Sequence, residues 1–299
     1  MIRRSVIFLC LLAMLVACHS KDAPAGSTGP RIVSLSPAVG VLLTDLHEVH
    51  LCVGRDGHDT ALHPSIPVVG DQNQIDYEAL VACRPTLIFT QWGSRELPAR
   101  LLELADANHW RVFDSRLLSL DDIRQGAVQV DQEVCTARGE PAPSDDCRDL
   151  LARLDAAWTP HPGAFERLGK VLLLAQTSPA AAFGPGSCHY QLLDRLGATP
   201  AIPEGAAYIN LDSEDIVQLA PDAIILISPR SANTPPPSAQ DAKKIHDLKF
   251  APIAKLDIPA AKNGRMAIID DPQGFIPSTS LIRVGEEMKK VLEGWAGQP

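Results

Sequence analysis

The sequence predicts an α/β protein of two lobes, each a mostly parallel β-sheet flanked by helices, bridged by a long connecting helix. Three features predict this architecture: a repeated helix–strand unit, apolar strand-like runs that alternate with helical segments, and a strand-free helical stretch in mid-chain. Alternation of strands and helices favours a parallel sheet, because parallel neighbours need a crossover connection that a helix usually supplies.

The repeat pairs residues 75–89 with residues 211–225 without a gap. Each copy has an aspartate that can cap a short helix, a proline that ends it, and an apolar run typical of a buried strand. Glu78 and Glu214 occupy the same place in the first helical turn. Glutamate also favours that place for its interaction with the helix dipole, so two unrelated α/β units are the alternative. The side facing the core is expected to consist of Leu80, Val81, Ile216 and Val217.

The first lobe is expected to span residues 31–142 and to open with a strand that leads into a helix. Ser36 can cap this helix, with Pro37 at its first position, where a backbone N–H would have no helical partner in any case. The expected strands are residues 31–35, 49–53, 86–90 and 111–114, and the expected helices are residues 77–83 and 95–108.

Residues 143–169 are predicted to form the connecting helical segment, because leucines recur there at helical spacing with charged residues between them. Its main helix is expected to start near Pro143 or Ser144. The second lobe, residues 170–299, follows. Its expected elements are a strand at 170–175, a turn at 184–187, a helix at 188–196, the repeated unit at 213–227, a strand at 265–270 and a helix at 279–295.

The N-terminus, residues 1–17, places two arginines before a short apolar run. This pattern is typical of a secretory signal and is too short to span a bilayer. Its end resembles the lipobox of bacterial lipoproteins, which implies cleavage before Cys18 and lipid on that cysteine. Such an anchor holds a protein on a membrane when it carries more than one acyl chain. An ordinary signal with a chance cysteine is the alternative, and residues 18–30 are expected to be a flexible tether.

Composition excludes several functions. The net charge of −9 argues against a nucleic-acid partner, which would favour a basic face. The chain has no Walker-type phosphate loop and no CxxC zinc spacing. We find no Ser-His-Asp order, paired acids or activated thiol that would indicate an enzyme. We therefore expect a non-enzymatic protein with no cofactor and no resident metal.

Cys135 and Cys147 are the expected disulfide. Of the seven cysteines, Cys10 goes with the signal and Cys18 with the lipid, which leaves five, an odd number. Cys135 and Cys147 flank a turn-rich segment between two helical stretches, and an oxidising compartment would favour their pairing.

Several blocks together resemble the periplasmic-binding-protein family of ABC importers whose two lobes are joined by a single long helix. The resemblance covers nearly all of residues 31–295, and the order and spacing of the blocks carry it. Members of that family bind cobalamin, iron–siderophores or haem. The matching blocks are residues 31–37, Val53-Gly54, residues 77–80 with Arg84-Pro85, residues 184–187 with Leu192, Leu193, Leu196 and Gly197, residues 213–222 and residues 266–270.

The resemblance implies a monomeric, lipid-anchored solute-binding protein in the periplasm or at the cell surface. It would capture a cobalamin-like corrinoid or an iron–siderophore between the lobes and deliver it to an ABC permease. Glu78 and Glu214 fall where the family's lobes each offer a glutamate to permease arginines. One alternative is a haem- or metal-binding member of the same architecture. Another is a lipoprotein that reuses the scaffold as an enzyme or a surface-interaction module.

The ligand is expected where the carboxyl ends of the strands of both lobes face each other. Trp92 would offer a flat stacking surface there, although it could equally be a loop residue that covers the sheet edge. His189 and Tyr190 could be axial haem ligands, and arginines could hold carboxylates. The expected ligand-binding residues are Ser36, Pro37, Arg55, Trp92, His189, Tyr190 and Arg230.

A group of histidines lies close together in the sequence, beside two aspartates. Imidazole and carboxylate are ligands of transition metals, so metal binding is an alternative to solvated loop positions, although no metal site is predicted. The group consists of His47, His50, His58 and His63, with Asp56 and Asp59.

Overall fold

The structure, a computed structural model, describes residues 29–297 apart from residues 72 and 94. The predicted signal peptide, the lipidated Cys18 and most of the tether lie outside the described residues. Across the part of the chain that is described, no helix combines the length and apolar character needed to cross a bilayer.

The N-terminal lobe is a four-stranded sheet of order β2-β1-β3-β4, with all neighbours parallel. Ser36 caps the first helix as predicted: its hydroxyl accepts from the N–H groups of Ala38 and Val39, and Pro37 occupies the first turn. The strands are β1 (Ile32–Leu35), β2 (Cys52–Arg55), β3 (Leu87–Thr90) and β4 (Arg111–Asp114), and the helices are α2 (Pro37–Asp45), α3 (Tyr77–Cys83) and α4 (Ala99–Asn108).

Two elements of this lobe begin later than the sequence indicated. The strand expected at 49–53 is preceded by a 3-10 turn, Val49–Leu51, so that β2 starts at Cys52. The helix expected from residue 95 starts at Ala99, because Pro98 has the extended conformation of a residue outside the helix. In both cases the sequence pattern begins a few residues before the residue at which the strand or helix starts.

The C-terminal lobe is a mixed six-stranded sheet of order β10-β9-β5-β6-β8, in which β7 also pairs with β5. β6 runs antiparallel to both β5 and β8. The strands are β5 (Lys170–Thr177), β6 (Ala180–Phe183), β7 (Thr199–Pro200), β8 (Tyr208–Leu211), β9 (Ala223–Ile227) and β10 (Met266–Ile269). The helices are α7 (Cys188–Arg195), α8 (Ser213–Leu219), α9 (Ala239–Phe250), α10 (Pro259–Lys262) and α11 (Leu281–Ala296).

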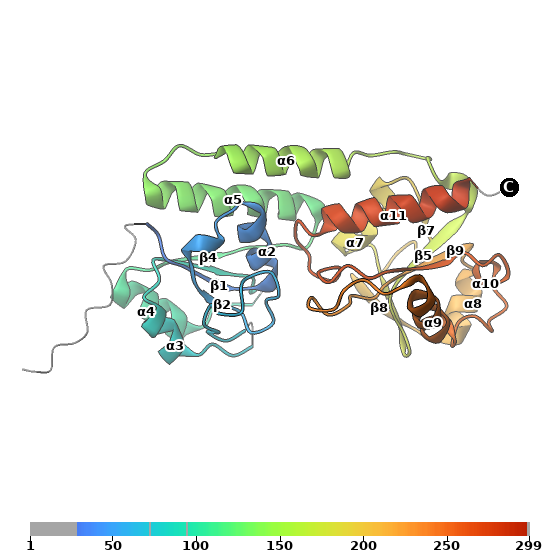
Figure 1. Ribbon diagram of the computed structural model, residues 1–299, viewed down its shortest axis with the longest axis horizontal. Coiled ribbons are helices and arrows are strands. Elements are labelled where there is room, and N and C mark those ends of the chain that lie inside the picture. Colours follow the sequence, from blue (N-terminus) through green and yellow to red (C-terminus); the bar gives the residue numbers. More distant parts are fainter. Residues whose placement is uncertain (1–28, 72, 94, 298–299) are drawn as a thin grey trace, which may run out of the picture.

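The bridge between the lobes contains the predicted helix and a longer companion. The predicted helix is α6 (Asp145–Ala157), capped by Ser144. The companion is α5 (Leu120–Arg138), which begins with a capping box and lies within the range expected to be first lobe. The two helices lie side by side along the top of Figure 1, and α11 packs against α6 over the second lobe. One hydrophobic core runs through these helices into both lobes.

The sequence repeat is also a structural repeat. α3 and α8 both end in a left-handed residue that is not glycine, Arg84 at φ 46° and Ala220 at φ 45°. At the start of the strand that follows each helix, Thr86 N–H donates to Arg31 O and Asp222 N–H donates to Lys170 O, both at 2.8 Å. Figure 1 shows α3 and α8 on the side of the molecule opposite α6. Both lobes are therefore built on the same unit.

The prediction of which residues of these two helices face the core is correct for only two of the four. Leu80 and Ile216 are buried, but Val81 and Val217 are each 42% exposed. The helices have only two turns, so few residues in each reach the core: Leu80 and Cys83 in α3 and Ile216 in α8. The neighbouring valines are exposed, as are the glutamates.

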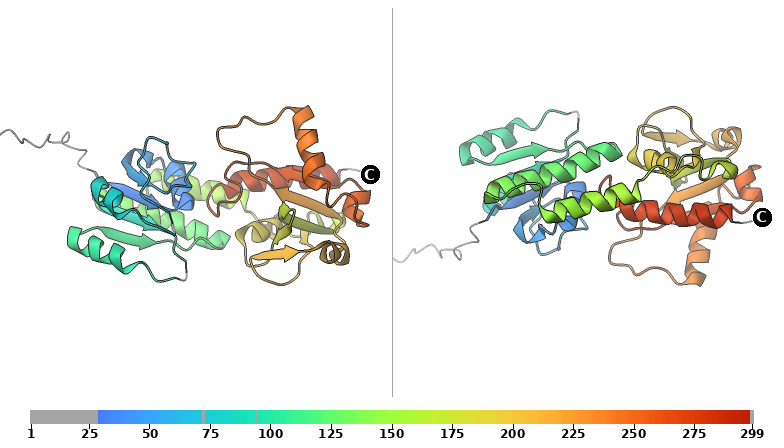
Figure 2. Two further views of the ribbon diagram at one scale, coloured as in Figure 1. Left: turned by 90° about the horizontal axis from the view of Figure 1, so that it is seen from below. Right: turned by 90° about the horizontal axis from the view of Figure 1, so that it is seen from above.

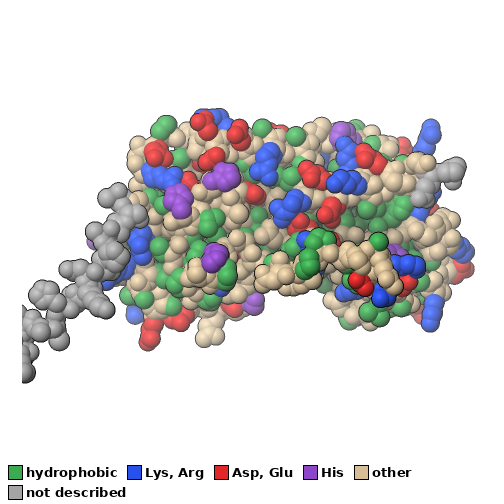
Figure 3. Space-filling model, in the orientation of Figure 1, with side chains coloured by type: hydrophobic (Ala, Val, Ile, Leu, Met, Phe, Trp, Pro, Cys, Tyr) green, Lys and Arg blue, Asp and Glu red, His purple; other side chains and the backbone are tan. Residues whose placement is uncertain are grey.

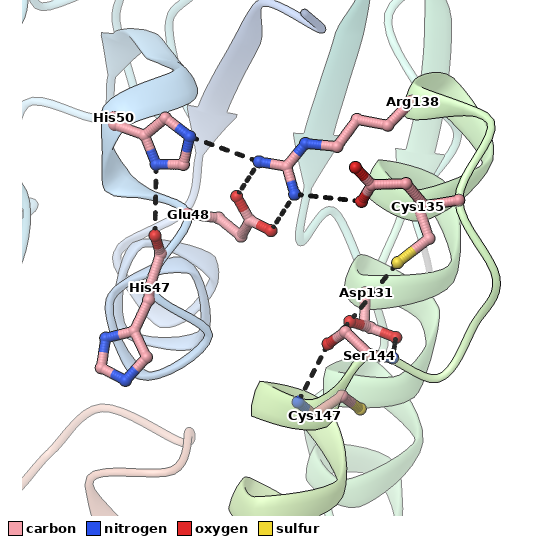
Figure 4. Close-up of polar contacts among 9 residues, drawn as sticks. His47, Glu48, His50, Asp131, Cys135, Arg138, Ser144 and Cys147 are labelled. Carbon is pink, nitrogen blue, oxygen red and sulfur yellow. Dashed lines mark hydrogen bonds and ion pairs between the residues drawn. The ribbon is translucent and has the colours of Figure 1, made fainter.

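The expected disulfide is not present, since Cys135 and Cys147 are both free thiols. The buried carboxylate of Asp131 closes the turn between α5 and α6 instead: it accepts from the Ser144 N–H at 3.0 Å and from the Ser144 hydroxyl (Figure 4). Cys135 Sγ lies 3.8 Å from Asp131 Oδ1. Burial raises the pKa of Cys147 to about 11, which keeps this thiol protonated.

Candidate ligand-binding site between the lobes

A cavity of about 250 Å³ lies where the carboxyl ends of the N-terminal strands face the second lobe. The first lobe contributes the start of α2 and the loops that follow β2 and β3. The second lobe contributes the segment between β10 and α11. The lining residues are Pro37, Ala38, Asp56, His58, Asp71, Asn73 and Gln91 from the first lobe, and Phe275, Ile276 and Pro277 from the second.

The wall formed by the first lobe is polar. Ser36 Oγ donates to Gln91 Oε1 at 2.9 Å, which holds the glutamine side chain at the cavity. Asp71 accepts from the N–H groups of Asn73 and Gln74, and these bonds hold the pKa of its carboxyl below the usual range. His58 Nε2 lies 3.5 Å from Asp71 Oδ2, with most of the histidine side chain exposed. Among the described residues that line the cavity there is no lysine or arginine.

Two buried carboxylates lie in the loop after β2. Asp56 is 1% exposed and Asp59 is 5% exposed. Asp56 Oδ1 accepts from the His58 N–H at 2.7 Å, and Asp59 Oδ1 accepts from the Ala61 N–H at 2.7 Å. The second oxygen of each carboxylate is buried and has no hydrogen-bond partner among the described residues. Burial raises the pKa of both carboxyls.

The wall formed by the second lobe is apolar, and Phe275 is its aromatic residue. Phe275 is 46% exposed and contacts the ring of Phe183 edge-on, with centroids 6.0 Å apart. Tyr208, which is 51% exposed, contacts the same ring edge-on at 6.5 Å. Such offset aromatic contacts hold rings in place while leaving other faces accessible. Tyr208 and Phe275 thus pack against the same ring, and Phe275 is the member of the three that lines the cavity.

His189 supports this wall from behind. Its ring stacks on Phe183 with centroids 4.2 Å apart, and its Nε2 lies 2.7 Å from the carbonyl oxygen of Gly274, the residue before Phe275. Burial lowers the pKa of His189 to about 4, so the ring is neutral and donates to that carbonyl at neutral pH. His189 thus positions the Phe275 segment.

Hydrogen bonds also join the lobes beside the cavity. Ser278 Oγ donates to Ala38 O at 2.7 Å, and Thr279 Oγ1 donates to Asp45 Oδ2 at 2.5 Å. Both acceptors belong to α2 of the first lobe. The segment that carries Phe275 is consequently tied to the opposite wall at its far end.

The structure places Trp92 in the core of the first lobe and not in the cavity wall. The residue is only 9% exposed and packs with Val33 and Leu101. The guanidinium carbon of Arg95 lies 4.7 Å from the centroid of its ring. The expected stacking surface is therefore absent, because the adjacent core and Arg95 cover the indole.

The two predicted axial ligands are also engaged elsewhere. His189 is 3% exposed, and Tyr190 donates its hydroxyl to Ile202 O at 2.8 Å. Both side chains of this helix face the interior of the second lobe. The turn followed by His-Tyr predicted that both side chains would face the cleft. In α7 both side chains instead point toward the second lobe.

The two predicted arginines hold loops. Arg55 donates to the carbonyl oxygens of Ile66, Asp56 and Asp59. Arg230 donates to the carbonyl oxygens of Thr234 and Asp270 and lines a separate cavity of about 670 Å³. Of the seven expected ligand-binding residues, Pro37 lines the inter-lobe cavity and Ser36 supports it from behind.

The clustered histidines do not converge. His50 lies 3.3 Å from Arg138, which also pairs with Glu48 at the turn beside α5, and His47 accepts a contact from His50 through its carbonyl (Figure 4). His58 lies in the cavity wall. No group of His, Cys, Asp or Glu among the described residues is arranged to hold a metal ion.

Glu78 and Glu214 are exposed in the first turns of α3 and α8, as predicted. On the face drawn in Figure 3 the acidic and basic side chains are interspersed, so this face offers no continuous basic surface.

The sequence did not single out most of the residues that line the cavity, which are Ala38, Asp71, Asn73, Gln91, Phe275, Ile276 and Pro277, or the two rings that pack with Phe275, Phe183 and Tyr208. Phe183 and Tyr208 belong to β6 and β8, which, like the short β7, were not predicted. Ala180–Phe183 has three alanines, which have weak strand preference, so no strand signal was available there. Phe275 lies in a loop whose place depends on the whole second lobe.

No family model and no curated protein sequence matches this chain. Solved structures do match. The periplasmic heme-binding protein HutB of Vibrio cholerae is 20% identical with a TM-score of 0.65, covering 89% of this chain and 99% of that chain. The periplasmic vitamin B12 binding protein BtuF of Vibrio cholerae is 14% identical with a TM-score of 0.64, covering 91% and 99%.

A possible iron-binding, periplasmic solute-binding protein from Staphylococcus epidermidis is 16% identical, with a TM-score of 0.63 over 89% of this chain and 99% of that chain. At these identities the likeness establishes the fold. The chain has the two-lobed α/β fold of periplasmic solute-binding proteins, as the sequence predicted.

Proposed function

We propose that this protein is the solute-binding component of an ABC importer and that its ligand is a cobalamin-like corrinoid or an iron–siderophore held between the lobes. The proposal assigns no chemical step to the protein. The fold it shares with the solved binding proteins supports the role, and the cavity supports the class of ligand.

The single observation that carries the proposal is the pairing of two unlike walls. Phe275, Ile276 and Pro277 offer apolar surface, while Asp71, Asn73 and Gln91 offer hydrogen-bonding groups without a lining cation. A corrinoid has a broad apolar ring edged by neutral amides, so it would contact both walls without burying an unpaired charge. The cavity itself is smaller than the roughly 300–1,000 Å³ of typical ligand sites, so such a ligand would extend over the exposed aromatic rings.

Haem is the second candidate ligand, and His58 favours it. The imidazole of His58 is largely exposed at the cavity, where it could approach a metal centre. The acidic groups beside it, Asp56 and Asp71, weigh against haem because its propionates are negatively charged.

The proposal also includes delivery of the ligand to a permease and attachment of the protein to a membrane. Glu78 and Glu214 would dock onto arginines of the permease, one per lobe, and lipid on Cys18 would hold the protein at a membrane. The equivalent, outward places of the two glutamates on α3 and α8 support the first part. The lipobox-like sequence before Cys18 supports the second.

Titration with cyanocobalamin, a ferric hydroxamate siderophore and haemin tests the ligand class. We expect the wild-type protein to bind one of the first two, measured by calorimetry. Phe275→Ala should weaken that binding by roughly 1–3 kcal/mol, by analogy with the loss of an aromatic stacking partner.

Leu248→Ala is the matched control, because Leu248 is an exposed apolar residue of α9 that does not line the cavity. It should leave the affinity unchanged. Tight binding of haemin alone would favour the second candidate, and failure of all the probes to bind would overturn the proposal.

A further inference from the structure

A second cavity, of about 670 Å³, lies within the C-terminal lobe and shares no lining residue with the inter-lobe cavity. Its volume falls within the roughly 300–1,000 Å³ of typical small-molecule sites, whereas the inter-lobe cavity is smaller. The lining residues come from the segment after β9, from α9, and from β10 and the residue that follows it. The second cavity is therefore a separate candidate site, formed by one lobe alone.

One wall of the second cavity is stiff and poor in hydrogen-bond donors. It contains residues 235–237, three consecutive prolines, which lack a backbone N–H and have a fixed φ. The loop before them is anchored, because Arg230 Nε donates to Thr234 O at 3.1 Å and Arg230 Nη1 donates to Asp270 O at 2.9 Å. A wall that is held in shape before binding loses little freedom when a ligand contacts it.

Another wall is one face of α9, which the rest of the protein covers only in part. Ala242, Ile245 and Lys249 follow one another at spacings of three and four residues, which places them on one side of the helix. Of the twelve residues of α9, all of them described, Phe250 alone is buried. Ile245 is 41% exposed, so it offers apolar surface whose removal from water would favour binding.

Among the charged residues that line this cavity, one cation has no partner. Asp270 Oδ1 lies 3.5 Å from Arg230 Nη1. Asp241 Oδ1 lies 3.5 Å from Lys244 Nζ, so each lining acid already has a cation beside it. Lys249 is exposed and forms no hydrogen bond or ion pair with any described residue. An ammonium group next to apolar surface favours a ligand that combines an apolar body with one anionic group.

We propose that this cavity is a second ligand site and that it takes an aliphatic monocarboxylate. The chain packs on Ile245 and on the prolines of residues 235–237, and the carboxylate pairs with Lys249. Proline, alanine and isoleucine supply the apolar surface, and the described lining residues include no aromatic ring, which favours a flexible chain over a stacked ring system. The site does not depend on the proposed function, because the two cavities have no residue in common.

Titrations with octanoate, octanol and octylammonium test the site, because these probes share one chain length and differ in the charge of the head group. Binding is followed by NMR through the methyl signals of isoleucine side chains. Ile245 and Ile268 line the second cavity, and Ile276 lines the inter-lobe cavity, so their signals report on the two sites separately.

We expect octanoate to shift the Ile245 and Ile268 signals until they saturate and to leave Ile276 unchanged. Octanoate should bind roughly three- to fivefold more tightly than octanol, as one exposed ion pair allows, and octylammonium more weakly than octanol. Lys249→Gln should remove the advantage of octanoate over octanol. Lys255→Gln makes the same change in charge at an exposed lysine outside the cavity and should preserve that advantage.

Ile245→Ser should weaken the binding of octanoate and octanol alike, by about threefold or more, because both lose apolar contact. Leu248→Ser is the matched control, since Leu248 is an exposed residue of the same helix that does not line the cavity. It should leave both affinities unchanged, and melting curves establish that the variants are folded.

The inference is overturned if no probe gives saturable shifts, if the three probes bind equally, or if octanoate shifts Ile276 alone. It is also overturned if the Ile245 signal responds to protein concentration and not to octanoate, because α9 would then contact a second copy of the protein. None of these results bears on corrinoid or siderophore binding at the inter-lobe cavity, so the proposed function is tested separately.

Discussion

His189 shows how one buried residue links stability to pH. The unfolded chain protonates this side chain near its ordinary pKa of 6.5, whereas burial lowers the pKa in the folded protein to about 4. Its contribution to stability is complete above pH 6.5 and is lost as the pH falls through 4. The loss is about 1.4 kcal/mol per pH unit within this window, on the order of 3 kcal/mol in all.

We therefore expect His189→Gln to reduce the loss of unfolding free energy between pH 6.5 and pH 4. Glutamine can still donate to the Gly274 carbonyl but does not titrate. Denaturant unfolding of both proteins at several pH values measures the difference. His63→Gln is the control, because His63 is exposed and should leave the wild-type pH dependence unchanged. Identical pH dependence of wild type and His189→Gln would contradict the assignment.

At the scale of elements, the matched helices α3 and α8 lie on the same side of the molecule (Figure 1). Each carries an exposed glutamate and an exposed valine, Glu78 with Val81 and Glu214 with Val217. We expect Glu78→Arg with Glu214→Arg to abolish most uptake in cells, because like charges would then face the permease arginines. Ligand affinity and melting temperature should change little, since surface substitutions usually alter stability by about 0.5 kcal/mol or less.

The matched control reverses two exposed acids on the opposite side, Asp149→Arg in α6 with Glu293→Arg in α11. It changes the net charge by the same amount and should leave uptake intact. Normal uptake by the Glu78 and Glu214 double variant would show that the repeat serves the architecture of the lobes and not docking.

At the scale of the whole molecule, the lobes are joined by more than a flexible connection. A common core passes through α5, α6 and α11, and the Ser278 and Thr279 hydroxyls bond to α2 across the lobe boundary. Hinge closure requires a few residues that can absorb large backbone changes, and packed helices resist this.

We expect ligand binding to close the lobes by only a few degrees. Small-angle scattering should give nearly equal radii of gyration for the free and the ligand-saturated protein. Ser278→Ala with Thr279→Val removes the cross-lobe hydroxyl bonds and provides the comparison, because it should allow a larger difference between the two states. A marked compaction of wild type on ligand binding would refute the rigid bridge.

The sequence predicted local features closely where a few neighbouring residues decide them. The bounds of α3 and β4 match the expected ranges, Ser36 caps α2 with Pro37 at its first position, and α6 starts beside Ser144, as expected. Caps, proline stops and apolar periodicity act over one or two turns of chain, so their physics is contained in the local sequence.

By itself, then, the sequence determined the two-lobed α/β architecture, the repeat and the outward glutamates. Tertiary structure alone decided which side chains reach the cavity: it buried Trp92, turned His189 inward, closed the α5–α6 turn with Asp131 and brought Phe275 opposite Asp56. The physical reason is that burial and hydrogen bonding depend on which distant segment occupies the neighbouring space, and loops that line a site have no periodic pattern to reveal it.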